Sequence, residues 1–249
     1  MIVKIDNVPA ARPQAGITKA DVVFEELVEG GLTRLAAVFQ SADGDPVGPV
    51  RSTRTSDIDI VTLLNHPLYA FSGGNTTFVG EIRASGIVDV GFDARPDAYF
   101  RSGRAAPDNL YSRTSMLYTS APAGAGPPPA LFTFRQTGAA PTNAGAAPAR
   151  QATLGWPSAS AGWTWDASSQ TWKRTQNGST DVDQTGKAVT AANVIIQSVT
   201  YVTDGFASGE GINPPPPIPK AELVGQGDVW VLTGGMVIKG HWSRPSSTV

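Results

Sequence analysis

Two arginines three residues apart, Arg51 and Arg54, lie in the segment VGPVRSTRTSD among several hydroxyl side chains. A guanidinium group can bind a phosphate or a carboxylate through two parallel hydrogen bonds. If the following residues TSDIDIVTLL form a helix, both arginines precede its N-terminus, where free backbone N–H groups and the helix dipole also favour an anion. The segment therefore predicts an anion site to which Ser52 adds a hydroxyl group.

The same arginines could instead be internal partners of acidic side chains. Glu25 and Glu29 are four residues apart on one face of a predicted strand, and Asp57 opens the predicted helix. A carboxylate on an otherwise apolar strand face is costly unless it is paired. Both interpretations stay open, because one arginine can be structural while the other is exposed.

A second polar segment, FRSGRAAPDNLYS, contains Asn109 and Tyr111 in an irregular stretch. Polar residues and an aromatic ring on a loop can line a cleft. They can equally hold the loop together through turns that use the side chain of an Asp or Asn. Both possibilities remain open from the sequence.

Several classes of chemistry are excluded or disfavoured by composition. The net charge of −2 argues against a nucleic-acid partner, and the absence of cysteine excludes disulfides and thiolate chemistry. Only two histidines are present, far apart in sequence, and there is no G-x-S-x-G or P-loop motif. We expect no metal and no cofactor. No apolar run reaches the ~18 residues that a membrane span requires.

The elements that would position these residues alternate between strands and helices. IVKID reads as a strand, and ADVVFEELVEGGLTRLAAVFQS reads as a β-hairpin that turns at Glu29-Gly30-Gly31. TSDIDIVTLLNHP and NTTFVGEIRASG are predicted helices, the second with Asn75 as its N-cap and Gly86 as its stop. Residues 1–118 are therefore predicted to form an α/β or α+β domain with a hairpin-containing sheet and flanking helices.

Residues 119–249 are predicted to form a smaller, mostly β domain. Tracts rich in Ala, Gly and Pro open this half, and short strands with turns follow. All tryptophans of the chain lie here: Trp156, Trp163, Trp165, Trp172, Trp230 and Trp242. Exposed aromatic rings would stack on sugars, but a small β domain depends on buried aromatics, so the core interpretation is favoured.

Several motifs resemble the DUF3048 family of YerB-like bacterial lipoproteins. VKIDNVPAARPQAGITKADVVFEELVEGG, GPVRSTR, FSGG and APDNLYS occur in the order of its N-terminal domain, and GGMVIKGHWSR resembles its C-terminal domain. The resemblance covers nearly the whole chain. It implies an exported protein, lipid-anchored at the outer face of the bacterial membrane, with no established activity and no residue role to transfer.

Two departures from the family pattern stand out. The export signal and the lipid-bearing cysteine are missing, and the chain stops soon after WSR, where the family runs on to a closing strand. We therefore expect a trimmed chain whose second domain is truncated at its C-terminus. The resemblance still implies an extracytoplasmic location in the cell envelope.

These observations favour a non-catalytic cell-envelope protein that binds an anionic small molecule, a cell-wall component or a protein partner. The alternative is an enzyme acting on a phosphorylated or glycan cell-wall substrate, with arginines holding the anion and Glu25 or Glu29 as the base. A third possibility is a purely structural interaction module without a cleft. The candidate binding residues are Asp6, Asn7, Arg12, Glu25, Glu29, Arg34, Arg51, Ser52, Arg54, Asn109 and Tyr111.

Overall fold

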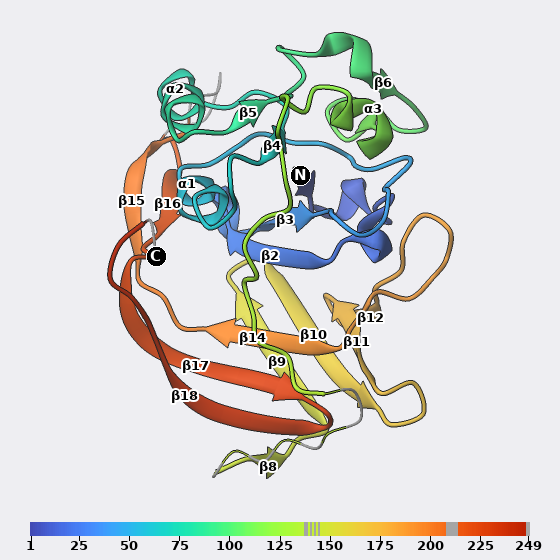
Figure 1. The fold of residues 1–249 in the computed structure, drawn as a ribbon, viewed down its shortest axis with the longest axis vertical. Coiled ribbons are helices and arrows are strands. Elements are labelled where there is room, and N and C mark those ends of the chain that lie inside the picture. The colour runs from blue at the N-terminus through green and yellow to red at the C-terminus, as the bar shows by residue number, and fades with distance from the viewer. Residues whose placement is uncertain (137–138, 140, 142, 144, 208–213, 248–249) are drawn as a thin grey trace.

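The N-terminal part of the chain is built around one mixed five-stranded sheet (Figure 1). The structure is a computed structural model that describes residues 1–136, 139, 141, 143, 145–207 and 214–247. In this sheet β2 (Val22–Leu27) and β3 (Thr33–Val38) form an antiparallel hairpin, and β3 pairs antiparallel with β1 (Ile2–Asp6). On the other side of β1, β4 (Leu68–Ala70) and β5 (Val88–Asp89) run parallel to it.

Each face of this sheet carries its own apolar core. Helices α1 (Ser56–Val61) and α2 (Thr76–Ala84) contribute Ile60, Val61, Val79 and Ile82 to one core. The short strands β6 (Tyr99–Arg101) and β7 (Leu110–Ser112) and the helix α3 (Thr114–Tyr118) cover the opposite face. Four single 3-10 turns, η1 (Pro9–Ala11), η2 (Ile17–Lys19), η3 (Glu29–Gly31) and η4 (Pro96–Ala98), connect these elements.

The described residues of the C-terminal part form two larger antiparallel sheets and a separate two-stranded pair. One has the order β12 (Ser179–Thr180), β11 (Thr171–Gln176), β10 (Ala159–Asp166), β9 (Gln151–Trp156), and β13 (Thr190–Ala191) also pairs with β11. The fully buried Trp172 of β11 lies against Trp165 of β10 at a ring distance of 5.2 Å. Strands β10 and β11 form an antiparallel hairpin, and burial of Trp172 supports the core interpretation for that residue.

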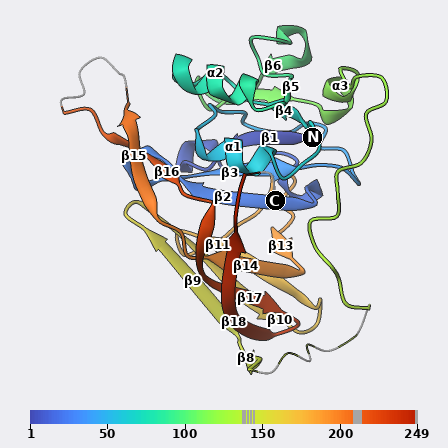
Figure 2. The same ribbon diagram turned by 60° about the vertical axis from the view of Figure 1, so that its left-hand side comes forward.

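The other sheet of the C-terminal part has the order β14 (Asn193–Gln197), β17 (Gly225–Thr233), β18 (Met236–Arg244), β8 (Ala147–Pro148). A separate pair, β15 (Tyr201–Phe206) and β16 (Pro217–Ala221), rises beside β2 and α1 (Figure 2). Residues 119–136 descend from α3 toward β8 without helix or strand (Figure 1). The Ala- and Gly-rich tract that follows lies partly outside the described residues.

Hydrogen bonds tie the two parts together far from the sequence junction. The backbone N–H of Ala221 donates to the Ser56 hydroxyl at 2.9 Å, and the guanidinium of Arg244 donates to the Asp59 carbonyl at 2.8 Å. The hairpin turn at η3 also takes part, because the Gly31 carbonyl accepts from the backbone N–H of Ser158 at 3.0 Å. A Cβ at Gly31, whose φ is +72°, would lie 2.6 Å from the side chain of Pro157.

The predicted α/β class of the N-terminal half is wrong. The chain is mostly β, with 40% strand and 14% helix, and the described residues contain three α-helices. The helix expected over TSDIDIVTLL has only six residues, since Leu63 and Leu64 donate to carbonyls three positions back and the chain leaves the helix there. The hairpin and the Asn75-capped helix α2 are confirmed, with Asn75 accepting from Thr77 at 2.9 Å. The division at residue 118 stays a prediction.

Candidate functional site

Arg51 and Arg54 both turn inward onto carboxylates. The guanidinium of Arg54 forms a fork with Glu29, with Nε to Oε2 at 3.0 Å and Nη2 to Oε1 at 2.8 Å. The Nε of Arg51 donates to the buried carboxylate of Asp6, and its Nη2 is 3.9 Å from Asp108 Oδ1. The internal interpretation therefore holds for both arginines: Arg54 meets the predicted partner Glu29, whereas Arg51 meets Asp6.

The carboxylate of Asp57 caps the start of α1. The carboxylate of Asp57 accepts from the Arg54 backbone N–H at 2.8 Å and from the Thr53 hydroxyl at 3.0 Å. The Ser52 hydroxyl donates to the Ser72 carbonyl at 3.1 Å. The helix expected from the sequence is therefore short, and its own carboxylate occupies the Arg54 N–H that an anion would use.

Behind these arginines lies a buried ion triad that the sequence interpretation missed. Lys4 of the central strand β1 is fully buried between the carboxylates of Glu26 and Asp57, with its Nζ 2.6 Å from Asp57 Oδ1. Burial lowers the pKa of Lys4 to about 8, and the charge of Asp57 opposes that effect. A charged residue at the centre of the apolar strand IVKID was the signal available in the sequence.

Arg34 differs from its two neighbours because no carboxylate of the described residues is in ion-pair contact with it. Its Nη1 donates to the Ser52 carbonyl at 3.1 Å, whereas its buried Nε has no hydrogen-bond partner among the described residues. Burial and the nearby charge of Arg54 lower the pKa of Arg34 to about 10, although Asp6 and Glu29 act in the opposite direction. We call Arg34, Arg51, Arg54, Asp6 and Glu29 the guanidinium cluster.

The charges of the guanidinium cluster and of the adjacent Lys4 triad cancel only when the two groups are counted together. The guanidinium cluster holds three cations and two carboxylates, while the adjacent triad holds one cation, Lys4, and two carboxylates. The excess positive charge of the cluster is therefore offset by the excess negative charge beside it. Arg34 is the cation at which hydrogen bonding is least complete.

The opposite face of the same sheet edge carries a second polar network. The Asn7 amide donates to Thr33 Oγ1 at 2.8 Å and to Glu25 Oε1 at 3.2 Å, and Thr33 in turn donates to Glu25 at 2.8 Å. The buried Gln14 donates to Asn7 Oδ1 at 2.9 Å. Two predicted site residues, Asn7 and Glu25, are thus brought together.

The C-terminal part completes this network from β11. Arg174 donates through Nη2 to Glu25 Oε2 at 2.9 Å and through Nη1 to Asp181, and Gln176 Oε1 accepts from Asn7 at 3.2 Å. Burial alone would lower the pKa of Arg174, but the charges of Glu25 and Asp181 outweigh burial and raise it. We call these side chains, Asn7, Gln14, Glu25, Thr33, Arg174, Gln176 and Asp181, the junction network.

Arg12 lies beside the junction network without joining it. No hydrogen bond or ion pair connects its guanidinium to another described residue, and its Nε is buried. Burial lowers the pKa of Arg12, and the charges of Asp181 and Arg174 act on it in opposite directions. Arg12 and Arg34 are therefore the two predicted site residues whose Nε lacks an acceptor.

Asn109 and Tyr111 stabilise their own loop through Arg104. The Arg104 guanidinium donates to the Tyr111 hydroxyl at 2.8 Å and to the Pro13 carbonyl at 2.8 Å, and the Asn109 amide donates to the Arg104 carbonyl at 2.8 Å. The ring of Tyr111 also packs on Gly48, where φ is +145° and a Cβ would lie 2.9 Å from the ring. These contacts favour the interpretation in which the polar residues of this segment hold the loop together and do not line a cleft.

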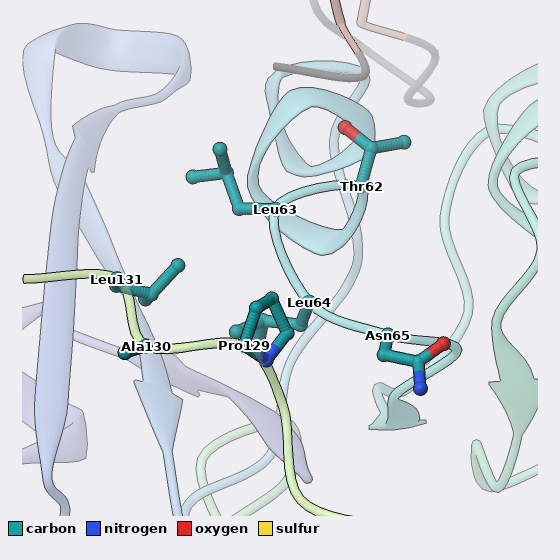
Figure 3. A pocket seen from close by; sticks show the side chains of 7 residues that line it. All are labelled: Thr62, Leu63, Leu64, Asn65, Pro129, Ala130 and Leu131. Carbon is teal, nitrogen blue, oxygen red and sulfur yellow. The ribbon is translucent and has the colours of Figure 1, made fainter.

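A cavity of about 400 Å³ lies at the other end of α1, away from the arginines (Figure 3). Its lining residues are Thr62, Leu63, Leu64, Asn65, Pro129, Ala130 and Leu131. Its only side-chain hydrogen-bonding groups are one hydroxyl and one amide, so it offers little chemistry beyond apolar contact. None of the predicted site residues lines it.

Two domain models of one protein family match the two halves of the chain. Residues 1–125 match the model described as protein of unknown function (DUF3048) N-terminal domain, and residues 152–249 match the corresponding C-terminal domain. Over 52 residues the chain is 56% identical to the protein named "Putative lipoprotein YerB" of Bacillus subtilis (strain 168). That match spans 21% of this chain and 16% of the relative.

The fold is also found in a solved structure. The crystal structure of the YerB protein from Bacillus subtilis matches 98% of this chain and 80% of its own, with a TM-score of 0.78 and 22% identity. At that identity the match establishes the fold alone. Among the described residues, no helix combines the length and apolar character that a membrane crossing requires.

Proposed function

This chain belongs to the DUF3048 family of proteins of unknown function, and we propose that it is a cell-envelope protein that binds a small anion at the guanidinium cluster. The name of the Bacillus subtilis relative as a lipoprotein supports the envelope location. The anion would be a phosphate or a carboxylate, because these groups match the guanidinium fork.

The observation that carries this proposal is the incomplete hydrogen bonding of Arg34. Its Nε is buried without an acceptor, and a buried donor left unpaired costs about 1–3 kcal/mol. An anion oxygen beside Arg34 would satisfy this donor and reduce the repulsion from Arg54 that contributes to the lowered pKa. Binding would therefore recover a cost that the free protein carries.

Access would run past Arg51, whose side chain is 23% exposed, compared with 11% for that of Arg54. Its contact with Asp108 is long, at 3.9 Å, so Nη2 can turn to an arriving anion while Nε keeps Asp6. Arg54 is held on both sides by Glu29 and the Thr53 carbonyl and would act as a fixed neighbour. No observation among the described residues favours an enzyme over a binding protein.

The test is thermal unfolding of the wild type with and without pyrophosphate and N-acetylmuramic acid. Ligand at about 100 times its Kd should raise the midpoint by roughly 5 °C or more. Arg34→Met keeps most of the aliphatic volume of the side chain and should abolish the shift. Arg83→Met, at an exposed ion pair with Asp89, should keep it. If neither compound moves the wild-type midpoint, anion binding at the cluster is refuted.

A further inference from the structure

A free strand edge borders an apolar groove in the C-terminal part. β9 is the last strand of its sheet and pairs only with β10, so its other edge faces away from the sheet. The Trp165 backbone N–H donates to the Arg150 carbonyl at 2.8 Å, which fixes the alternation of the antiparallel ladder. By that alternation the backbone N–H and C=O groups of Gln151, Thr153 and Gly155 point to the free edge.

No hydrogen bond joins these edge groups to any other described residue. Proteins protect such edges with prolines, charged side chains or short strands, because an open edge pairs with other chains. β9 has the sequence QATLGW, which contains no charge and no proline over its six residues. The free edge of β9 can therefore form backbone hydrogen bonds with another extended strand.

A groove of about 150 Å³ adjoins this edge. Its lining residues are Ala149, Gln151, Ala152, Thr153, Leu154, Ile196, Trp230, Leu232 and Val237. β9 and β18 start close together near β8 and diverge along their length (Figure 2). The groove is lined by β9 on one side and by residues of β14, β17 and β18 on the other. One wall is Trp230, which is 44% exposed.

The mouth of the groove carries a positive charge. The Nζ of Lys239 lies 4.5 Å from the ring centre of Trp230, and no carboxylate among the described residues is in ion-pair contact with it. A sugar would find few hydrogen-bonding side chains on this lining, namely those of Gln151, Thr153 and Trp230. An extended peptide meets the edge with its backbone, the groove with alternate apolar side chains and Lys239 with an acidic residue.

We propose that β9 is a docking edge for an extended peptide of a partner protein, in which apolar residues alternate with polar or acidic ones. The peptide adds a strand to the sheet and covers Trp230. This surface lies in the C-terminal part and does not depend on anion binding at the guanidinium cluster.

The test uses a fluorescein-labelled synthetic peptide, Thr-Val-Glu-Val-Thr-Val-Glu, and fluorescence anisotropy with the full chain. N-methylation of alternate residues removes the N–H groups of one edge of the peptide at a time. Strand addition predicts that methylation on one parity weakens binding at least tenfold, while methylation on the other parity changes it less than twofold. This comparison leaves the protein unaltered and does not depend on the folding of a variant.

Two protein variants complete the test. Trp230→Ala should weaken binding about tenfold, and Phe134→Ala, at an exposed aromatic residue outside the groove, should leave it unchanged. Equal effects of both methylation parities would overturn the proposal, as would absence of binding up to millimolar peptide. Quenching of tryptophan fluorescence by chitotetraose but not by the peptide would overturn it in favour of a glycan. Self-association that Thr153→Pro removes, without peptide binding, would overturn it in favour of a second copy.

Discussion

Replacing Lys4 by methionine should destabilise the protein strongly. The ammonium group of Lys4 is fully buried and contacts Glu26 and Asp57, so its removal leaves two buried carboxylates without their cation. Breaking a buried ion pair in this way costs about 3–5 kcal/mol. The free energy of unfolding of a domain is only about 5–15 kcal/mol, so Lys4→Met should shift the urea midpoint far down or prevent folding.

The structure also predicts which second substitution rescues this loss. Glu26 depends on Lys4 most, because its Oε2 is buried and none of the residues that the structure describes donates a hydrogen bond to it. Asp57 keeps the Arg54 backbone N–H at 2.8 Å and the Thr53 hydroxyl at 3.0 Å after Lys4 is removed. Lys4→Met with Glu26→Leu should therefore recover most of the lost stability, since a well-packed apolar pair can replace a buried ion pair at little cost.

Urea unfolding of the wild type, both single variants and the double variant would measure the coupling between the two positions. We expect a coupling of about 2 kcal/mol or more, with the double variant more stable than Lys4→Met alone. A Lys4→Met protein within about 0.5 kcal/mol of the wild type would refute the buried triad. Additive losses in the double variant would refute the dependence of Glu26 on Lys4.

Three further outcomes follow from the same contacts. Because the folded pKa of Lys4 is about 8, below its ordinary 10.5, the unfolded chain binds more protons between these values, so stability should rise by up to about 3 kcal/mol as pH increases from 8 toward 10. Urea titrations should show this rise in the wild type and not in the double variant Lys4→Met with Glu26→Leu. Above about pH 10 the rise in stability should end, because tyrosine ionises at that pH in the unfolded chain, whereas burial raises the pKa of Tyr69 in the folded protein. Arg174→Met should cost about 3–5 kcal/mol by leaving Glu25 and Asp181 unpaired, and limited proteolysis should then cleave between the two parts of the chain faster than in the wild type. Gly48→Ala should cost at least about 1–3 kcal/mol, because φ of +145° and the close Tyr111 ring both exclude a Cβ; a urea midpoint equal to that of the wild type would contradict this.

Local features of the fold could be predicted from the sequence, because neighbouring residues determine them. The turn at Glu29-Gly30-Gly31 and the N-cap at Asn75 each depend on a few adjacent side chains, and both are present. The predicted extent of α1 was wrong. The sequence TSDIDIVTLLNHP indicated a helix that begins near Asp57, but nothing in it showed that the helix would end at Val61. The predicted fold class was wrong because it gave the helices too large a share of the structure, of which only 14% is helix.

The partners of the polar residues could be predicted only in part. Arg54 and Glu29 meet because the hairpin and the helix pack together, and the sequence already suggested this pair. Glu25 meets Arg174, which is 149 positions away, and no local pattern indicates such a contact. Lys4 was missed because a lysine in a strand is usually exposed, and only the positions of Glu26 and Asp57 make its burial tolerable.

The hydrogen bond from Arg244 to the Asp59 carbonyl allows docking of the C-terminal sheets to be measured during folding. The last long strand, β18, ends on α1, so the end of β18 and the start of β1 lie in the same half of the molecule (Figure 2). A donor and an acceptor fluorophore placed near these two ends would therefore be close only when the C-terminal sheets have docked. Energy transfer between them would report the final assembly step separately from formation of the first sheet.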